Sequence, residues 1–171
     1  LAMSVLGTRT VPRMPSPAAY EAYLRGRFLR QQATQASLTR AREYFEEAIR
    51  LDPGYAAAFA GIADVYHVLG GPGWEFSPPR ELLPRALETA QRALDLDPQL
   101  ADGYAVRGMS RLWFDWNAAP AEEDLRRAIA FNSSFAQAHQ YLSTVLTVQG
   151  HLDEAITAAA HAAHLDPLSP I

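Results

Sequence analysis

The sequence predicts an all-α fold, a solenoid of stacked antiparallel helix pairs with about eight helices. The tripeptide Leu-Asp-Pro occurs at 51–53, 96–98 and 165–167, and a weaker copy, Phe131-Asn132-Ser133, lies between the last two. The steps between the third residues of these four motifs are 45, 35 and 34 residues. Repetition at this period is typical of stacked helical hairpins, which build binding surfaces more often than active-site clefts.

An alanine-rich helix is expected before each motif. These four helices span 41–50, 86–95, 121–130 and 155–164. Two alanines recur seven residues apart in each helix, and the residue between them is Phe45, Ala90, Leu125 or Ala159. Spacings of four and three place these residues on one helical face, where small side chains allow a neighbouring helix to approach closely. The proline that follows forces the chain to turn.

A second periodic pattern follows each turn and predicts the first helix of the next unit. Each unit is therefore a helix, a short turn, a helix and a proline-marked turn. The first unit is the least regular, because the segment 31–38 predicts a long turn between its helices. The expected organisation is a linker with the tail of a preceding helix at 1–16, units at 17–54, 55–99, 100–134 and 135–168, and the start of a further helix at 169–171.

The segment 70–79 is rich in glycine and proline and accounts for the long first step, so it predicts a loop. We expect a short helical turn after this loop and a kink or restart at Pro84. Trp74 and Phe76 lie in the loop. They either pin it against the helix that ends at Leu69 or form an exposed aromatic anchor for a partner.

Arg107 and Arg111 occupy positions that are apolar in the other units. We expect their aliphatic stems to lie on apolar surface with the guanidinium groups in solvent. Ion pairs with Asp115, Glu122 or Glu123 are the alternative.

The composition argues against several classes of function. The chain has 171 residues, no cysteine and a net charge of −4, so it offers no disulfide and no thiolate metal site. No apolar run approaches the ~20 residues that span a bilayer. The arginines form no dense basic stripe of the kind that nucleic-acid binding requires. We therefore expect a cytoplasmic segment with no membrane insertion and no direct nucleic-acid contact.

No motif for phosphate binding, nucleophilic catalysis or zinc-dependent proteolysis is present, and we predict no enzyme activity, no metal and no cofactor. His161 and His164 lie three residues apart, with His151 ten residues earlier, but a third converging ligand is not evident. Asp64 and His67 share a helical face as a potential acid–base pair, although an ion pair or plain solvation is more common than catalysis.

The repeat resembles the tetratricopeptide repeat (TPR). An aromatic start, Tyr66, the paired alanines and the closing proline are in register over 18–167, and the unit at 135–167 matches without insertion. The resemblance implies a right-handed solenoid whose concave face is lined by the first helix of each unit. The segments 19–28, 60–66 and 115–117 are also similar to the C-terminal repeat tracts of bacterial regulators linked to winged-helix, adenylate cyclase or kinase domains.

The register of the first helices predicts the positions that face the groove. The candidate partner-binding residues are Asp64, His67, Asp102, Met109, Leu112, Trp113, Gln137, Gln140 and Thr144. In the TPR sub-group that clamps the acidic C-terminal tails of chaperones, Lys, Arg and Asn line this groove. None of these types occurs among the candidates, so we predict that chaperone-tail binding is absent.

Three functions remain open at this point. The first is a protein–protein interaction scaffold, part of a larger bacterial signalling or transcription-regulatory protein, with a protein or peptide partner. The second is a tract that senses a ligand or peptide and controls an attached output domain, for which Met109, Leu112 and Trp113 would supply an apolar pocket. The third is self-association through exposed ends of the stack.

Overall fold

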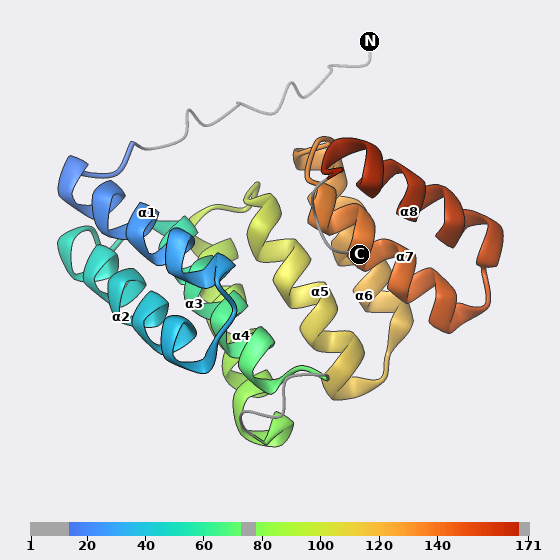
Figure 1. The fold of residues 1–171 in the computed structure, drawn as a ribbon, viewed down its shortest axis with the longest axis horizontal. Coiled ribbons are helices and arrows are strands. Elements are labelled where there is room, and N and C mark those ends of the chain that lie inside the picture. Colours follow the sequence, from blue (N-terminus) through green and yellow to red (C-terminus); the bar gives the residue numbers. More distant parts are fainter. Residues whose placement is uncertain (1–13, 73–77, 168–171) are drawn as a thin grey trace, which may run out of the picture.

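The computed structural model describes residues 14–72 and 78–167, which form eight α-helices and no strands (Figure 1). The helices are α1 (Pro17–Gln31), α2 (Gln35–Leu51), α3 (Ala56–Gly70), α4 (Pro79–Leu96), α5 (Ala101–Asp115), α6 (Ala118–Phe131), α7 (Ala136–Gln149) and α8 (Leu152–Leu165). Trp74, Phe76 and the segment 169–171, for which the sequence made predictions, lie outside the described residues.

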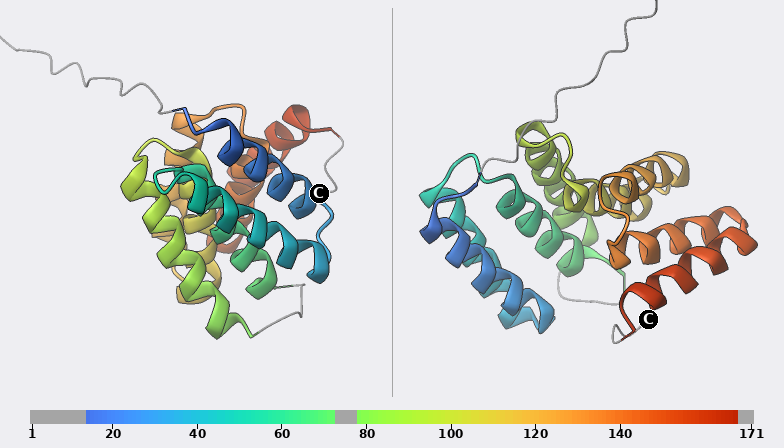
Figure 2. Two further views of the ribbon diagram at one scale, coloured as in Figure 1. Left: turned by 90° about the vertical axis from the view of Figure 1, so that its left-hand side faces the viewer. Right: turned by 90° about the horizontal axis from the view of Figure 1, so that it is seen from above.

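The helices form four successive hairpins, and each hairpin packs on the next to give a curved stack (Figures 1 and 2). The predicted solenoid of stacked helix pairs is confirmed. The odd-numbered helices also contact one another from hairpin to hairpin, through the pairs α1–α3, α3–α5 and α5–α7. Within the described part of the chain the even-numbered helices make no such contacts. The odd-numbered helices therefore lie on the inner, concave side of the curve.

The repeated Leu-Asp-Pro motif ends the second helix of a hairpin in the same way each time. The backbone N–H of Asp52 donates to the carbonyl of Ala48, and the Asp52 carboxylate accepts the N–H of Gly54 at 3.2 Å. Asn132 accepts the N–H of Ser134 at 3.2 Å, so the copy that lacks the proline keeps the same turn. At Asp52, Asp97 and Asn132 the carboxylate or amide at the second position is thus the shared turn-forming group.

The alanine face predicted for the second helices is buried. Ala41, Ala48, Ala86, Ala93, Ala121 and Ala128 are all 0% exposed. Phe45, which lies between two of these alanines, is packed between two glycines of neighbouring helices. A methyl group on Gly26 of α1 would lie 2.7 Å from the Phe45 ring, and one on Gly61 of α3 would lie 2.8 Å from it. The absence of side chains at both positions makes room for the ring.

Two local predictions were wrong. The turn of the first hairpin spans 32–34, shorter than the predicted 31–38 although still longer than the turns at 116–117 and 150–151. It is shortened because Thr34 caps α2 early: its Oγ1 accepts the N–H of Ser37 at 3.1 Å, and Ser37 Oγ accepts the N–H of Thr34 at 3.0 Å. Helix α4 also runs through Pro84, so the expected restart is wrong, and the kink that was its alternative stays a prediction. A proline this close to the helix start removes one intrahelical hydrogen bond, and the buried Leu83 and Ala86 on either side of it hold the helix on the core.

Candidate functional site

A pocket of about 160 Å³ lies on the concave side of the stack, where all four odd-numbered helices contribute side chains. Its lining consists of Tyr23, Arg27, Arg30 and Gln31 from α1, Phe45 from α2, Ala57, Ala60, Gly61 and Asp64 from α3, Asp102 and Val106 from α5, and Phe135 and Gln137 at the start of α7. Since α3 contacts both α1 and α5, its small residues form the floor between two walls. The pocket is mixed in character, with aromatic, charged and amide groups.

Arg30 and Asp64 form a two-bond ion pair across the pocket. Arg30 Nε donates to Asp64 Oδ2 at 2.5 Å and Arg30 NH2 donates to Oδ1 at 3.1 Å. The two side chains are 24% and 18% exposed, so the pair is largely shielded from solvent. The Asp64 carboxylate raises the pKa of Arg30 above its ordinary value. This pair joins α1 to α3 and neutralises one arginine of the concave face.

Arg27 and Asp102 are the other two charged groups of the pocket, and both are exposed. The guanidinium of Arg27 lies over the ring of Tyr23, 5.9 Å from its centroid. Desolvation within the concave face raises the pKa of Asp102, and the nearby Arg27 partly counters this shift. Burial raises the pKa of Tyr23 to about 12, so its phenol stays protonated at neutral pH.

His67 is buried on the inner side of the stack, where it contacts Ser110 and Tyr141. One ring nitrogen of His67 lies 3.1 Å from Ser110 Oγ, and the His67 ring meets Tyr141 edge-on at a centroid separation of 5.9 Å. Burial lowers the pKa of His67 to about 4, so the imidazole is neutral at pH 7. The predicted acid–base pair of Asp64 with His67 does not form, because Arg30 takes Asp64 and Ser110 takes His67.

The structure brings only some of the predicted partner-binding residues to the pocket. Asp64, Asp102 and Gln137 line it, and Gln137 also donates to Tyr141 Oη at 2.6 Å. Gln140 and Thr144 are half-buried farther along α7, where the Thr144 hydroxyl donates to the Gln140 carbonyl at 3.3 Å.

The apolar pocket expected from Met109, Leu112 and Trp113 is not formed. Met109 is 4% exposed and Leu112 is 0% exposed, because this side of α5 packs into the core with α6, α7 and α8. Trp113 is half-buried and meets Trp116 edge-on at 6.1 Å. In this conformation Met109 and Leu112 are core residues, out of reach of a partner.

Sequence reasoning missed the residues that α1 contributes, Tyr23, Arg27 and Arg30. The groove positions predicted from the sequence begin in the second unit, because the first unit is the least regular. A methyl group on Gly26 of α1 would meet Phe45 of its partner helix, as one on Gly108 of α5 would meet Leu125 of its partner. This shared small residue was the signal that could have extended the register to α1. The concave face therefore does contain arginines, contrary to the premise used for chaperone tails, although Arg30 is already paired.

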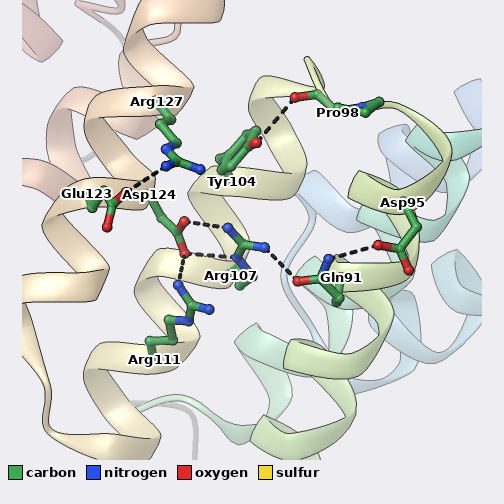
Figure 3. A network of polar contacts seen from close by, with 9 residues as sticks. All are labelled: Gln91, Asp95, Pro98, Tyr104, Arg107, Arg111, Glu123, Asp124 and Arg127. Carbon is green, nitrogen blue, oxygen red and sulfur yellow. Dashed lines mark hydrogen bonds and ion pairs between the residues drawn. The ribbon is translucent and has the colours of Figure 1, made fainter.

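Arg107 and Arg111 are not among the residues that line the pocket. Their guanidinium groups converge on one carboxylate (Figure 3). Both pair with Asp124 of α6, a residue that is 2% exposed, and neither uses Asp115, Glu122 or Glu123. Arg107 also donates to Gln91 Oε1 of α4 at 2.6 Å. The predicted solvent-facing arrangement was wrong because a buried carboxylate lies within reach of both guanidinium groups.

The histidines singled out by the sequence are on the surface. His151, His161 and His164 are all exposed, and the centroid of the His161 ring lies 4.4 Å from that of His139. Over 14–72 and 78–167, no three His, Cys, Asp or Glu side chains gather as potential metal ligands. None of the described helices is long and apolar enough to cross a bilayer.

Comparison with known proteins gives similarity in structure only. No protein-family model matches the sequence, and no curated protein matches it either. TTC0263, a thermophilic TPR protein of Thermus thermophilus, superposes with a TM-score of 0.70 at 20% identity, over 88% of this chain and 75% of that one.

Two further solved structures are of proteins described as binding peptides. YrrB, described as a TPR protein with an unusual peptide-binding site, gives a TM-score of 0.54 at 23% identity, over 87% of this chain and 69% of that one. The second TPR of Spaghetti (RPAP3), bound to the HSP90 peptide SRMEEVD, gives 0.53 at 22% identity, over 66% of this chain and 93% of that one. These similarities and the four stacked hairpins show that the chain has the fold of tetratricopeptide repeat proteins.

Proposed function

We propose that this chain is a protein–protein interaction module that holds a short peptide segment of its partner in the concave pocket. The observation that carries the proposal is the convergence of α1, α3, α5 and α7 on one small pocket. A site formed by every repeat is shaped by the curvature of the whole stack, which suits an extended ligand lying across the helices.

The size of the pocket favours a peptide over a small-molecule ligand. Sites for drug-sized ligands occupy roughly 300–1,000 Å³, whereas this pocket measures about 160 Å³. A cavity of about 150 Å³ takes a group as large as benzene. Side chains on one side of a peptide therefore suffice to fill the pocket, while the peptide backbone lies along the groove.

The similar structures support this interpretation by analogy. YrrB is described as having a peptide-binding site, and the Spaghetti domain is seen with an HSP90 peptide. This chain differs in one respect from a repeat domain that clamps acidic tails: its Arg30 is already paired with Asp64 through two hydrogen bonds. We keep the prediction that an acidic chaperone tail is not its ligand.

The cellular context is part of the proposal. We propose that the module belongs to a larger bacterial signalling or transcription-regulatory protein in the cytoplasm, on the resemblance of segments in its first three units to the repeat tracts of such regulators. The pocket is proposed to be non-catalytic, since its titratable groups are ion-paired, as Arg30 and Asp64 are, or serve as charges on the rim. Sensing of a small ligand is disfavoured by the pocket volume and by the burial of Met109 and Leu112.

The test is to block the pocket without disturbing the core. Ala57 is half-buried on the pocket floor, so Ala57→Phe places a ring in the space. Ala160→Phe, at an exposed position of α8, is the matched control. We expect a peptide array probed with the wild-type chain to show bound peptides that Ala57→Phe loses and Ala160→Phe keeps. Bound peptides that survive Ala57→Phe, with circular dichroism showing an intact fold, would overturn the proposal.

A further inference from the structure

The concave pocket contains two opposite charges that have no ion-pair partner among the described residues. Of its four charged side chains, Arg30 and Asp64 neutralise each other through two bonds. Arg27 and Asp102 form no ion pair within 14–72 and 78–167, although Arg27 is near enough to influence the Asp102 carboxylate electrostatically. The net charge of the pocket is zero, but the remaining two charges are separated.

The separation has a defined direction. Arg27 belongs to α1 and Asp102 to the first turn of α5. Helix α3 contacts both α1 and α5, and its Ala57, Ala60 and Gly61 form the floor between them. The two charges therefore lie on opposite walls of the pocket, and the pocket has a positive wall and a negative wall.

A ligand with one charge satisfies only half of such a site. An acidic group at Arg27 leaves Asp102 desolvated beside the bound peptide, and a basic group at Asp102 does the same to Arg27. A ligand with both charges compensates both walls, whereas one with the charges on the wrong sides meets like charge at each wall. Side chains two residues apart in an extended peptide lie on the same side, about 7 Å apart.

We propose that the pocket selects peptide segments that carry an acidic and a basic side chain on the same side, the acidic one against Arg27 and the basic one against Asp102. This inference rests on the proposed function and specifies the class of peptide. It separates this chain from repeat domains that read an acidic tail, because the arginine that would clamp such a tail, Arg30, is already neutralised by Asp64.

The probes are blocked peptides in one alanine-based frame, with Glu and Lys flanking a central residue that is varied over all types. Matched peptides replace Glu, Lys or both by Gln. The central residue that gives the tightest binding is then kept, and fluorescence anisotropy measures the affinity of the peptide in each of its charged and neutral forms. We expect the peptide with both charges to bind about fivefold more tightly than either singly charged peptide, the factor that corresponds to about 1 kcal/mol for a partly exposed ion pair.

Protein variants assign each charge to its wall. Arg27→Gln should remove the preference for Glu over Gln but keep the preference for Lys over Gln. Asp102→Asn should do the reverse, as in a double-mutant cycle. The controls are Arg25→Gln on the outer side of α1, where Glu21 pairs with Arg25, and Asp153→Asn, which lies in the first turn of α8 as Asp102 does in α5. The double variant Arg27→Glu/Asp102→Arg should bind the original peptide more weakly than the wild type does, and should prefer the peptide in which Glu and Lys are exchanged.

The outcomes distinguish the two proposals. Equal binding of charged and neutral peptides, or preferences that Arg27→Gln and Asp102→Asn leave unchanged, would overturn the inference while the pocket could still hold a peptide. The same holds if none of these probes binds although Ala57→Phe abolishes the capture of other array peptides. Capture that Ala57→Phe leaves intact would instead overturn the proposed function and this inference with it.

Discussion

Arg107 of α5 and Asp124 of α6 form a bidentate ion pair inside a hairpin, with Arg107 Nε 2.9 Å from Oδ2 and Arg107 NH2 2.5 Å from Oδ1 (Figure 3). The side chains are 11% and 3% exposed. Arg111 adds a third bond to the same carboxylate at 2.7 Å. One buried carboxylate thus compensates two arginines and fixes how α5 lies against α6.

Asp124→Asn tests this arrangement. The change leaves Arg107 and Arg111 without an anion in a site shielded from water, and we expect the free energy of unfolding to fall by about 3–5 kcal/mol. Urea denaturation followed by circular dichroism measures the loss.

The control for this prediction is Glu123→Gln, one residue earlier on α6. Glu123 pairs with Arg127 at 2.6 Å, but the two side chains are 65% and 52% exposed, so the loss should stay below about 1 kcal/mol. Replacing the buried charges together by apolar groups (Arg107→Met, Arg111→Met, Asp124→Leu) should recover most of the stability that Asp124→Asn loses. Equal losses for Asp124→Asn and Glu123→Gln would contradict the buried-pair account.

His67 predicts a dependence of stability on pH. Burial lowers its pKa in the folded chain to about 4, from the value of 6.5 that applies in the unfolded chain. Between these values the unfolded chain binds the additional proton, so the free energy of unfolding rises with pH across this window and falls on acidification. The contribution is on the order of 3 kcal/mol by linkage.

Urea denaturation from about pH 7 down to about pH 4 checks the prediction for His67, with His67→Gln as the variant. Gln keeps a hydrogen-bonding group near Ser110 but has no titrating ring, so the slope in this window should flatten. His161→Gln, at an exposed position of α8, should leave the slope as in the wild type. An unchanged slope in His67→Gln would show that another group causes the dependence.

Asp102→Asn should stabilise the chain slightly at neutral pH. Because the pKa of Asp102 is raised in the folded state, the folded chain holds its proton more tightly than the unfolded chain, and stability falls as pH rises through that window. The carboxylate is exposed, so the gain on removing its charge should stay below about 1 kcal/mol. Thermal unfolding at neutral pH measures it, and a clear loss of stability relative to Asp153→Asn would contradict the assigned cause.

Gly61→Ala should destabilise the stack. The new methyl group would lie 2.8 Å from the Phe45 ring, which cannot retreat because Gly26 packs on it as well. We expect a loss of about 1–3 kcal/mol from overpacking, larger than the gain of about 1 kcal/mol in helix propensity.

Gly103→Ala is the matched control for Gly61→Ala. The nearest atom there is the end of the Leu94 side chain, at 2.9 Å, and this flexible group can rotate away. The midpoint of thermal unfolding of Gly103→Ala should therefore stay near that of the wild type. A Gly61→Ala variant as stable as Gly103→Ala would show that the Phe45 ring is free to move.

The repeat itself could be predicted from the sequence because it depends on residues that are close together in the chain. Alanines seven residues apart define the packing face of each second helix, and the Asp or Asn at each motif makes its turn through a bond to an N–H two residues on. Such bonds need only neighbouring residues. Thr34 and Ser37 form a similar local pair of bonds that starts α2. The prediction of a long first turn did not take this pair into account.

The partners of Arg30, Arg107 and Arg111 could not be read in this way, because each of them comes from another helix. Asp64 is three residues from His67 yet pairs with Arg30, which lies 34 residues away. Arg107 pairs with Asp124 rather than with Glu122 or Glu123, the acidic residues that precede it on α6. Which carboxylate a guanidinium meets depends on the rotation and separation of whole helices.

By itself, then, the sequence determined the helices, their pairing into hairpins and the residues that seal them, since helical spacing and turn chemistry act over a few residues. Only the tertiary structure decided that α1 completes the concave pocket, that Met109 and Leu112 are core residues, and that Arg27 and Asp102 are the charges left for a ligand. Those outcomes depend on the curvature of the stack, which is set by contacts summed over all four hairpins.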